Sequence, residues 1–223
     1  QNAEMNLMQK KLYKIKSQRV TDYFSGSYSN EFIEEGIDIC VSTKDLPGET
    51  MLDAEIFSWY INTLHINGVS TLLSRFVNAY KGIDYSVFYE DLFEYLQQDE
   101  WWVREQSEVR QYFHNWMTQG RIRHPNVGGI EIHGWNLIHR TILNMHVEER
   151  YDHVFDLLER FMARYELPKD IMANLMRFQR LYLVAYKRVR EYPMQLDLDY
   201  NICEYLTAGA ELSNAPVHYR LEF

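Results

Sequence analysis

The sequence predicts a mainly α-helical protein, built as a bundle of about seven helices with a small β-sheet. Apolar residues recur at three- and four-residue steps over most of residues 49–189, which is typical of helices that bury one face. Three short segments instead alternate apolar and polar residues, which is typical of half-buried strands. They are residues 37–41, 194–198 and 217–223. We expect these strands to form one small sheet that packs on the helices.

Helix boundaries follow from the apolar pattern and from glycine, proline and capping residues. Gly68 and Gly82 stand where a left-handed residue would end a helix. Asp84 is suited to cap the start of the next helix, and Pro168 is tolerated in a first helical turn. The expected helices cover residues 49–66, about 69–80, 84–96, about 99–117, 135–145, 151–165 and 168–189, with a short helical segment at 200–206.

Composition excludes several classes of function. The chain of 223 residues carries a formal net charge of −9, which argues against nucleic acid as its main partner. The sequence has no run of about eighteen apolar residues and does not start like a signal peptide, so we expect neither a membrane span nor a signal peptide. The two cysteines, Cys40 and Cys203, belong to no metal-binding motif, so a cytoplasmic protein with reduced thiols is expected.

The first 36 residues differ from the rest of the chain. They are polar, with a basic cluster followed by an acidic one. We expect residues 1–36 to be an extended connection from a missing upstream domain, with room for a short helix near residues 7–13. Residues 37–223 are expected to form a single helical domain with the small sheet. Since the chain starts at Gln1 rather than at methionine, we expect a fragment or a trimmed chain.

Two groups of residues suggest ligand chemistry. His139, His146 and His153 are spaced by seven, and a metal site there would need one straight helix through residues 144–148, where a break is predicted. Surface or half-buried histidines are the alternative. The second group, in a loop over residues 119–130, has the cations needed to hold an anion beside glycine amides, although an ordinary interhelical loop explains it as well. Its cationic residues are Arg121, Arg123 and His124.

Several short motifs resemble the C-terminal region of radical S-adenosylmethionine proteins that carry a cobalamin-binding domain. They begin with Asn2 to Asn6, Val41-Ser42-Thr43-Lys44-Asp45-Leu46, Phe57-Ser58-Trp59 and Leu64-His65-Ile66. The tail adds Tyr192-Pro193, Asp199-Tyr200-Asn201-Ile202, Tyr205-Leu206 and Tyr219-Arg220-Leu221-Glu222-Phe223. The Cys-x-x-x-Cys-x-x-Cys run of that family is absent, as is its Asp-x-His-x-x-Gly cobalamin motif.

The resemblance implies an accessory domain that covers an upstream catalytic barrel and helps to shape the pocket for a small-molecule substrate. The parent protein would use a 4Fe–4S cluster and S-adenosylmethionine, with cobalamin as a further candidate cofactor, and none of these would be held by this segment. This segment alone is then expected to have no activity. The residues expected to face the barrel or the substrate are Trp59, His65, Arg121, Arg123 and His124.

Two other functions stay open at this stage. The high aromatic content of 15% suits a free-standing helical protein with an aromatic-lined pocket for a ligand. The histidines spaced by seven would suit a metal-dependent hydrolase. For Trp59 and His65, a place in the core is the alternative to a role in binding.

Overall fold

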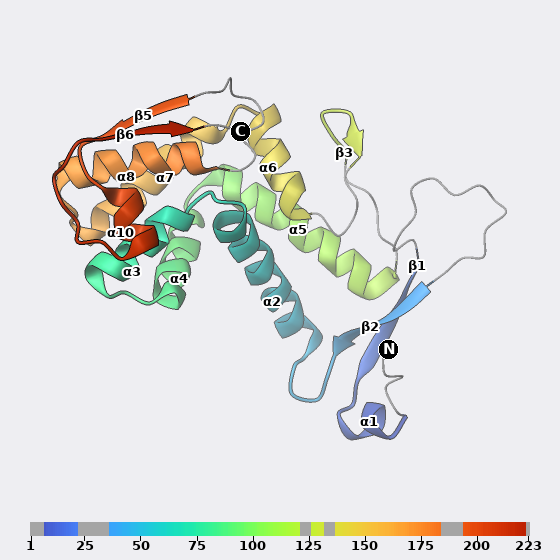
Figure 1. Ribbon diagram of the computed structural model, residues 1–223. Coiled ribbons are helices and arrows are strands. Elements are labelled where there is room, and N and C mark those ends of the chain that lie inside the picture. Colours follow the sequence, from blue (N-terminus) through green and yellow to red (C-terminus); the bar gives the residue numbers. More distant parts are fainter. Residues whose placement is uncertain (1–6, 22–35, 121–125, 132–136, 184–193, 222–223) are drawn as a thin grey trace. The chain divides into compact units, whose positions relative to one another are not determined.

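The computed structural model describes residues 7–21, 36–120, 126–131, 137–183 and 194–221, and it is mainly helical, as predicted (Figure 1). The chain folds into two compact units. Unit 1 contains residues 1–59 and 101–140, and unit 2 contains residues 60–100 and 141–223. Residues 37–223 have parts in both units, and that they form a single domain stays a prediction. It stays a prediction that residues 1–36 lead from an upstream domain.

Unit 1 pairs a β-hairpin with long helices. Its elements are α1 (Leu7–Leu12), β1 (Lys16–Thr21), β2 (Gly36–Ser42), most of α2 (Gly48–Ile61), most of α5 (Glu100–Gln119), β3 (Asn126–Val127), β4 (Ile130–Glu131) and the start of α6 (Leu137–Val147). The short helix for which there was room near residues 7–13 is present as α1. The loop predicted over residues 119–130 contains a tight hairpin between β3 and β4, in which Asn126 pairs with Glu131.

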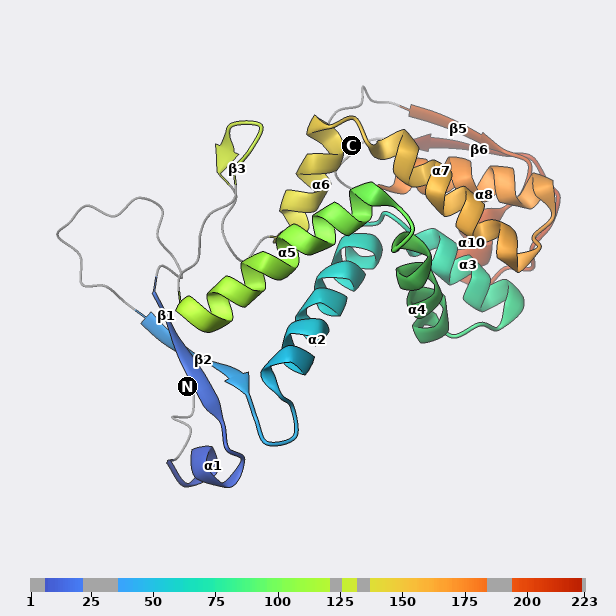
Figure 2. The ribbon, with the colours of Figure 1, turned by 180° about the vertical axis from the view of Figure 1, so that it is seen from behind.

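The core of unit 1 lies between the hairpin, α2 and α5. Val20 of β1, Leu52 of α2 and Trp116 of α5 are buried together. Leu52 near the start of α2 meets the end of α5, whereas Trp59 near the end of α2 packs against Trp102 near the start of α5. The two helices therefore run antiparallel, and both views show them side by side (Figures 1 and 2).

Unit 2 contains most of the remaining helices. Its elements are the π-helix η1 (Asn62–Ile66), α3 (Thr71–Lys81), α4 (Tyr85–Leu96), the rest of α6, α7 (Tyr151–Met162), the 3₁₀ turn η2 (Ala163–Tyr165), α8 (Lys169–Tyr182), β5 (Met194–Leu198), α10 (Ile202–Ala208) and β6 (Val217–Leu221). Its core is rich in aromatic rings, with Phe88 of α4 packed against Phe161 of α7 and Tyr165 of η2. No helix in the described ranges is long and apolar enough to cross a membrane.

The three predicted strands exist, but they do not share one sheet. β5 and β6 pair with each other, antiparallel, with Leu196 opposite Tyr219. β2 pairs instead with β1, antiparallel, with Arg19 opposite Asp38. The expectation of a single sheet is wrong because β1 is polar, apart from its buried Val20, and therefore lacks the alternation that revealed the other strands. Alternation identifies a buried face; it does not identify the partner strand.

Helix boundaries agree with the predicted ones in most places. Gly68 and Gly82 adopt φ angles of 84° and 70°, and Asp84 is the N-cap residue of α4. The helix expected over residues 49–66 is helical throughout, but its last five residues form a π-helix. The helix expected to reach residue 189 is α8, which ends at Tyr182; residues 184–193 lie outside the described part.

A buried glutamine joins α3 to α8. The side chain of Gln179 is fully buried, and its Oε1 accepts hydrogen bonds from the amides of Leu72, at 2.8 Å, and Leu73, at 3.4 Å. Its Nε2 donates to the carbonyl oxygen of Gly68 at 2.5 Å. The first amides of a helix lack partners within the helix, and Ser70 at the N-cap makes no capping bond with its side chain. Gln179 therefore satisfies the start of α3 from another helix.

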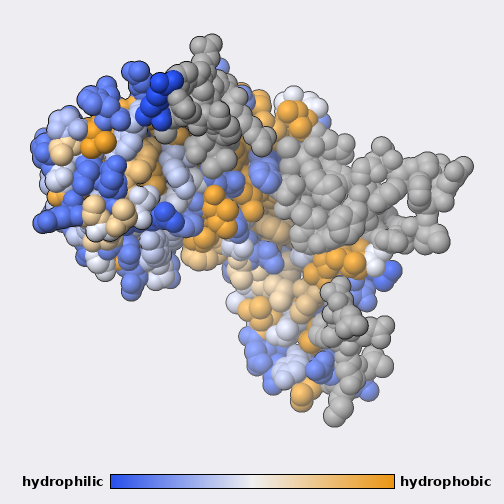
Figure 3. Space-filling model, viewed as in Figure 1, coloured by the Kyte–Doolittle hydropathy of each residue, from blue (hydrophilic) through white to orange (hydrophobic). Residues whose placement is uncertain are grey.

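The strand pair packs on α8 within unit 2. The ring of Phe178 stacks on that of Tyr219 of β6, with centroids 6.3 Å apart and planes inclined by 6°. Asn174 of α8 accepts from the amide of Asp199 at 2.7 Å. On the face of unit 2 seen in Figure 3, hydrophilic residues predominate and apolar ones stand in small groups between them. The sheet thus covers one side of α8 and keeps polar residues outward.

Candidate functional site

The structure places two of the five predicted site residues, and they belong to different units. Trp59 is 3% exposed in unit 1 and packs edge-on against Trp102, with ring centroids 6.2 Å apart. His65 lies in η1 of unit 2 and is half-buried. The other three, in the loop at residues 121–124, lie outside the described residues. A role of any of them in binding stays a prediction.

His65 is part of a buried cluster of hydrogen-bonding side chains. Its Nδ1 lies 2.7 Å from the hydroxyl oxygen of Tyr89. That hydroxyl is also 3.1 Å from Oγ of Ser74 and 3.3 Å from Oγ of Ser70. Both serine hydroxyls donate to backbone carbonyl oxygens. The single proton of Tyr89 must therefore serve the serines or the imidazole.

The proton positions follow from this count of donors. If Tyr89 donated to His65, two contacts between its oxygen and serine oxygens would have no proton between them. If Tyr89 donates to Ser74 and Nδ1 of His65 donates to Tyr89, only the longer contact of Tyr89 with Ser70 has no proton between its oxygens. We therefore assign His65 the tautomer with the proton on Nδ1, which leaves the lone pair on Nε2.

Burial and neighbouring charge keep this cluster uncharged at neutral pH. Burial lowers the pKa of the His65 imidazole below its ordinary value, and the nearby Arg75 guanidinium lowers this pKa further. Burial raises the pKa of Tyr89 to about 12, although its bonds with Ser70 and Ser74 oppose that rise. The donor count requires a proton on Nδ1 of His65 and on the phenol of Tyr89, and the lowered pKa of His65 leaves its Nε2 without a proton.

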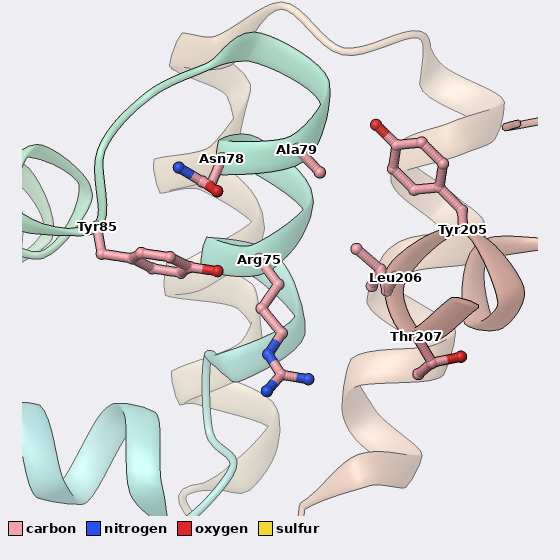
Figure 4. Close-up of a pocket in the computed structure, with 7 residues that line it drawn as sticks. All are labelled: Arg75, Asn78, Ala79, Tyr85, Tyr205, Leu206 and Thr207. Atoms are coloured by element: carbon pink, nitrogen blue, oxygen red, sulfur yellow. The ribbon is translucent and has the colours of Figure 1, made fainter. Parts of the chain in front are cut away.

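A pocket of about 490 Å³ lies beside this cluster, over the outer face of α3 (Figure 4). Arg75, Asn78 and Ala79 form its floor, because residues at i, i+3 and i+4 share one face of a helix. Tyr85, at the start of α4, stands on one side of α3, and α10 stands on the other. The complete lining is Arg75, Asn78, Ala79, Tyr85, Tyr205, Leu206 and Thr207.

Contacts with interior residues hold both sides of this pocket. The ring of His65 meets the ring of Tyr85 edge-on, with centroids 6.1 Å apart. On the other side, the ring of Tyr205 packs against that of Phe76, with centroids 5.6 Å apart, and Phe76 is fully buried. Asn78 donates to the carbonyl of Ile83 at 3.0 Å, which ties α3 to the turn before α4. The pocket is therefore formed before any ligand arrives.

The lining of the pocket favours negative charge. None of its seven residues is acidic. Arg75 is exposed and forms no ion pair with any residue in the described ranges. In contrast, a pocket of about 320 Å³ in unit 1 has Glu49 beside Lys16 and His114 in its lining. The pocket over α3 is thus the better candidate for a ligand that carries charge.

The histidines spaced by seven do not form a metal site. His139 and His146 belong to α6, whereas His153 belongs to α7. The chain turns between these helices, where Glu149 has a φ of 54°, so the predicted break is confirmed. His153 pairs with Asp99 of the same unit at 2.8 Å. In the part of the chain that is described, no three His, Cys, Asp or Glu side chains are grouped to hold a metal ion.

No protein-family model matches the chain. No curated protein matches it at a significant level.

Sequence reasoning missed the residues that line the pocket over α3, apart from the motif Tyr205-Leu206. Arg75, Asn78 and Ala79 interrupt the apolar stripe of the second predicted helix at helical spacing, which marks an outward face. Tyr85 follows the predicted cap residue and gives no such signal. Only the approach of α10 to α3, about 130 residues apart in sequence, reveals that these residues share a pocket.

Proposed function

We propose that this chain is an accessory module of a radical S-adenosylmethionine enzyme with a cobalamin-binding domain. It would cover the upstream catalytic barrel and contribute to the pocket for a small-molecule substrate, without catalysing a reaction alone. The proposal is supported by the family motifs in the sequence. It is supported further by the preformed pocket over α3, because its wall residue Tyr85 rests on His65, which lies in one of those motifs.

The chemistry of such an enzyme explains why a helical module would be useful. A radical intermediate must be kept from water and from stray reductants, and protein elements that cover the barrel mouth do this. The residues of this chain do not fit the iron–sulfur cluster. Cys40 and Cys203 are its only cysteines and belong to separate units. The cluster, S-adenosylmethionine and cobalamin would therefore be bound by upstream residues, and this chain would supply surface and substrate contacts.

The longer protein that this proposal requires provides the test. After anaerobic purification, we expect iron and sulfide in the ratio of a 4Fe–4S cluster and reductive cleavage of S-adenosylmethionine to 5′-deoxyadenosine. A version that ends before residue 37 should retain the cluster and this cleavage but lose product formation from its substrate. A longer protein without a cluster, or without cleavage of S-adenosylmethionine, contradicts the proposal.

A free-standing ligand-binding protein is the second candidate. The observation that favours it is the pair of tyrosine rings, Tyr85 and Tyr205, in the lining of the pocket over α3. A mature protein limited to these 223 residues that retains a small molecule through purification would favour this candidate. Mass spectrometry of the denatured protein detects such a ligand.

A further inference from the structure

We infer that the pocket over α3 binds a small organic anion, with Arg75 pairing with the carboxylate or phosphate of the ligand. This inference does not depend on the proposed role as an accessory module, because the site is formed entirely by residues of unit 2. It therefore applies equally to a free-standing binding protein.

The charge environment favours an anion. The chain carries a net charge of −9. Many of its described arginines form an ion pair with a carboxylate, as Arg110 does with Asp53 and Arg164 with Asp91. Arg75 has no such partner among the described residues, although acidic residues outnumber basic ones. A guanidinium presents a planar fork that matches the two oxygens of a carboxylate or phosphate. Arg75 keeps this fork available at the pocket.

Hydrogen-bond donors around the pocket also favour an anion. Thr207 donates to the carbonyl of Cys203 at 2.7 Å and so is engaged within α10. The hydroxyl groups of Tyr85 and Tyr205 form no hydrogen bonds within the described part of the chain. Burial raises the pKa of Tyr205, so its phenol retains a proton. One cation and two phenols are thus available to oxygen atoms of a ligand.

Size and apolar contacts define the rest of the ligand. A volume of about 490 Å³ is within the range of about 300–1,000 Å³ found for small-molecule sites. Ala79 contributes only a methyl group to the floor. Leu206 points from α10 toward α3 and adds apolar surface. The site therefore suits a compact anion with a flat or apolar body, such as an aromatic acid or an aryl phosphate.

Titration calorimetry of the 223-residue chain tests the inference. The probes are benzoate, phenyl phosphate and the neutral benzamide, which has the shape of benzoate without its charge. We expect benzoate or phenyl phosphate to bind, and the stronger of the two identifies the anion. Benzamide should bind at least about tenfold more weakly, because it cannot form the charge-assisted pair.

Variants of two arginines locate the site. Arg75→Gln should weaken binding of the anion about tenfold or more, and Arg75→Lys should recover part of this loss, because it keeps the charge without the fork. The matched control is Arg177→Gln, since Arg177 is an exposed arginine of α8 in the same unit and lies outside the pocket lining. This control should bind the anion with the affinity of the wild-type chain. Arg75 is exposed, so a far-ultraviolet circular dichroism spectrum should show that the Gln variant folds.

The ring of His65 gives a second readout. An anion beside Arg75 reduces the effect of its charge on His65, so adding benzoate should shift the imidazole nuclear magnetic resonance signals. Equal loss of binding in the Arg75 and Arg177 variants overturns the inference, as does equal binding of benzamide. Absence of binding by both anions at millimolar concentration also overturns it. These results leave the proposed enzyme role untouched, because that role is tested by cluster content and S-adenosylmethionine cleavage in the longer protein.

Discussion

Replacing Gln179 by leucine should destabilise unit 2. The side chain of Gln179 is fully buried and joins α8 to the start of α3 through the amide of Leu72 and the carbonyl of Gly68. Leucine has nearly the same volume, so the change removes these hydrogen bonds without opening a large cavity. An amide and a carbonyl then remain buried without partners.

The size of the effect follows from the number of groups left without partners. Each buried polar group that loses its partner costs about 1–3 kcal/mol. The contact to Leu73 is longer, at 3.4 Å, and adds little. Two groups without partners therefore predict a loss of about 2–6 kcal/mol in the free energy of unfolding. The control is Gln98→Leu, since Gln98 is exposed in the same unit, and it should change this energy by less than about 0.5 kcal/mol.

Urea denaturation followed by circular dichroism measures the loss, and amide hydrogen exchange locates it. The Leu72 amide should exchange much faster in the Gln179→Leu variant than in the unchanged chain or the Gln98→Leu control. The role of Gln179 at this helix start is refuted if Gln179→Leu changes the free energy of unfolding by less than about 0.5 kcal/mol and the Leu72 amide stays protected from exchange.

Replacing Gln179 by glutamate tests the hydrogen bond that this side chain donates separately from those that it accepts. A protonated glutamic acid has the shape of glutamine and can donate to the Gly68 carbonyl, whereas the carboxylate cannot donate and is costly to bury. Burial would raise the pKa of this carboxyl above its unfolded value, so the penalty is absent below the unfolded pKa of about 4.3 and grows as the pH rises above it. Relative to the unchanged chain, Gln179→Glu should be less destabilised at low pH than at pH 7. Equal destabilisation at both pH values would contradict this.

Two further predictions concern charged groups. The pKa of His65, measured by nuclear magnetic resonance, should lie below the ordinary value for histidine and should rise in the Arg75→Gln variant. If it does not rise, the charge of Arg75 does not act on His65. Because the folded pKa is the lower one, this group should reduce stability as the pH falls below its unfolded pKa. In unit 1, Arg140 is 9% exposed and pairs with Glu105 at 2.9 Å, so Arg140→Met should cost about 3–5 kcal/mol in urea denaturation by leaving a buried carboxylate. Arg110→Met, which breaks an exposed pair, should cost less than about 1 kcal/mol, and equal costs would contradict the role of burial.

Local signals in the sequence predicted the elements well where one side of the chain is apolar. The stripe from Leu52 to Tyr60 fixed the position of α2, and the alternation at residues 194–198 and 217–223 located β5 and β6. These signals are reliable because burial of one face imposes a period on the residues that form it. β1 was not predicted, since Val20 is the only apolar residue in its sequence.

The candidate site was predictable only in part. His65 was singled out by its motif, but its link to Tyr89 joins residues 24 positions apart, and no periodicity marks such a pair. Trp59, chosen for the same reason, lies in the core of unit 1. A motif records that a residue type recurs, whereas burial decides whether its side chain can reach a ligand.

The sequence by itself determined that the protein is mainly helical, where most helices begin and end, and where β2, β5 and β6 lie. These properties depend on neighbours within a few residues, through hydrogen bonds along one helix and through the period of the buried face. Only the tertiary structure decided that β2 pairs with β1, that Gln179 completes the start of α3, and that Arg75, Tyr85 and Tyr205 share a pocket. Those contacts join distant segments, and each depends on how whole faces pack, which no local pattern specifies.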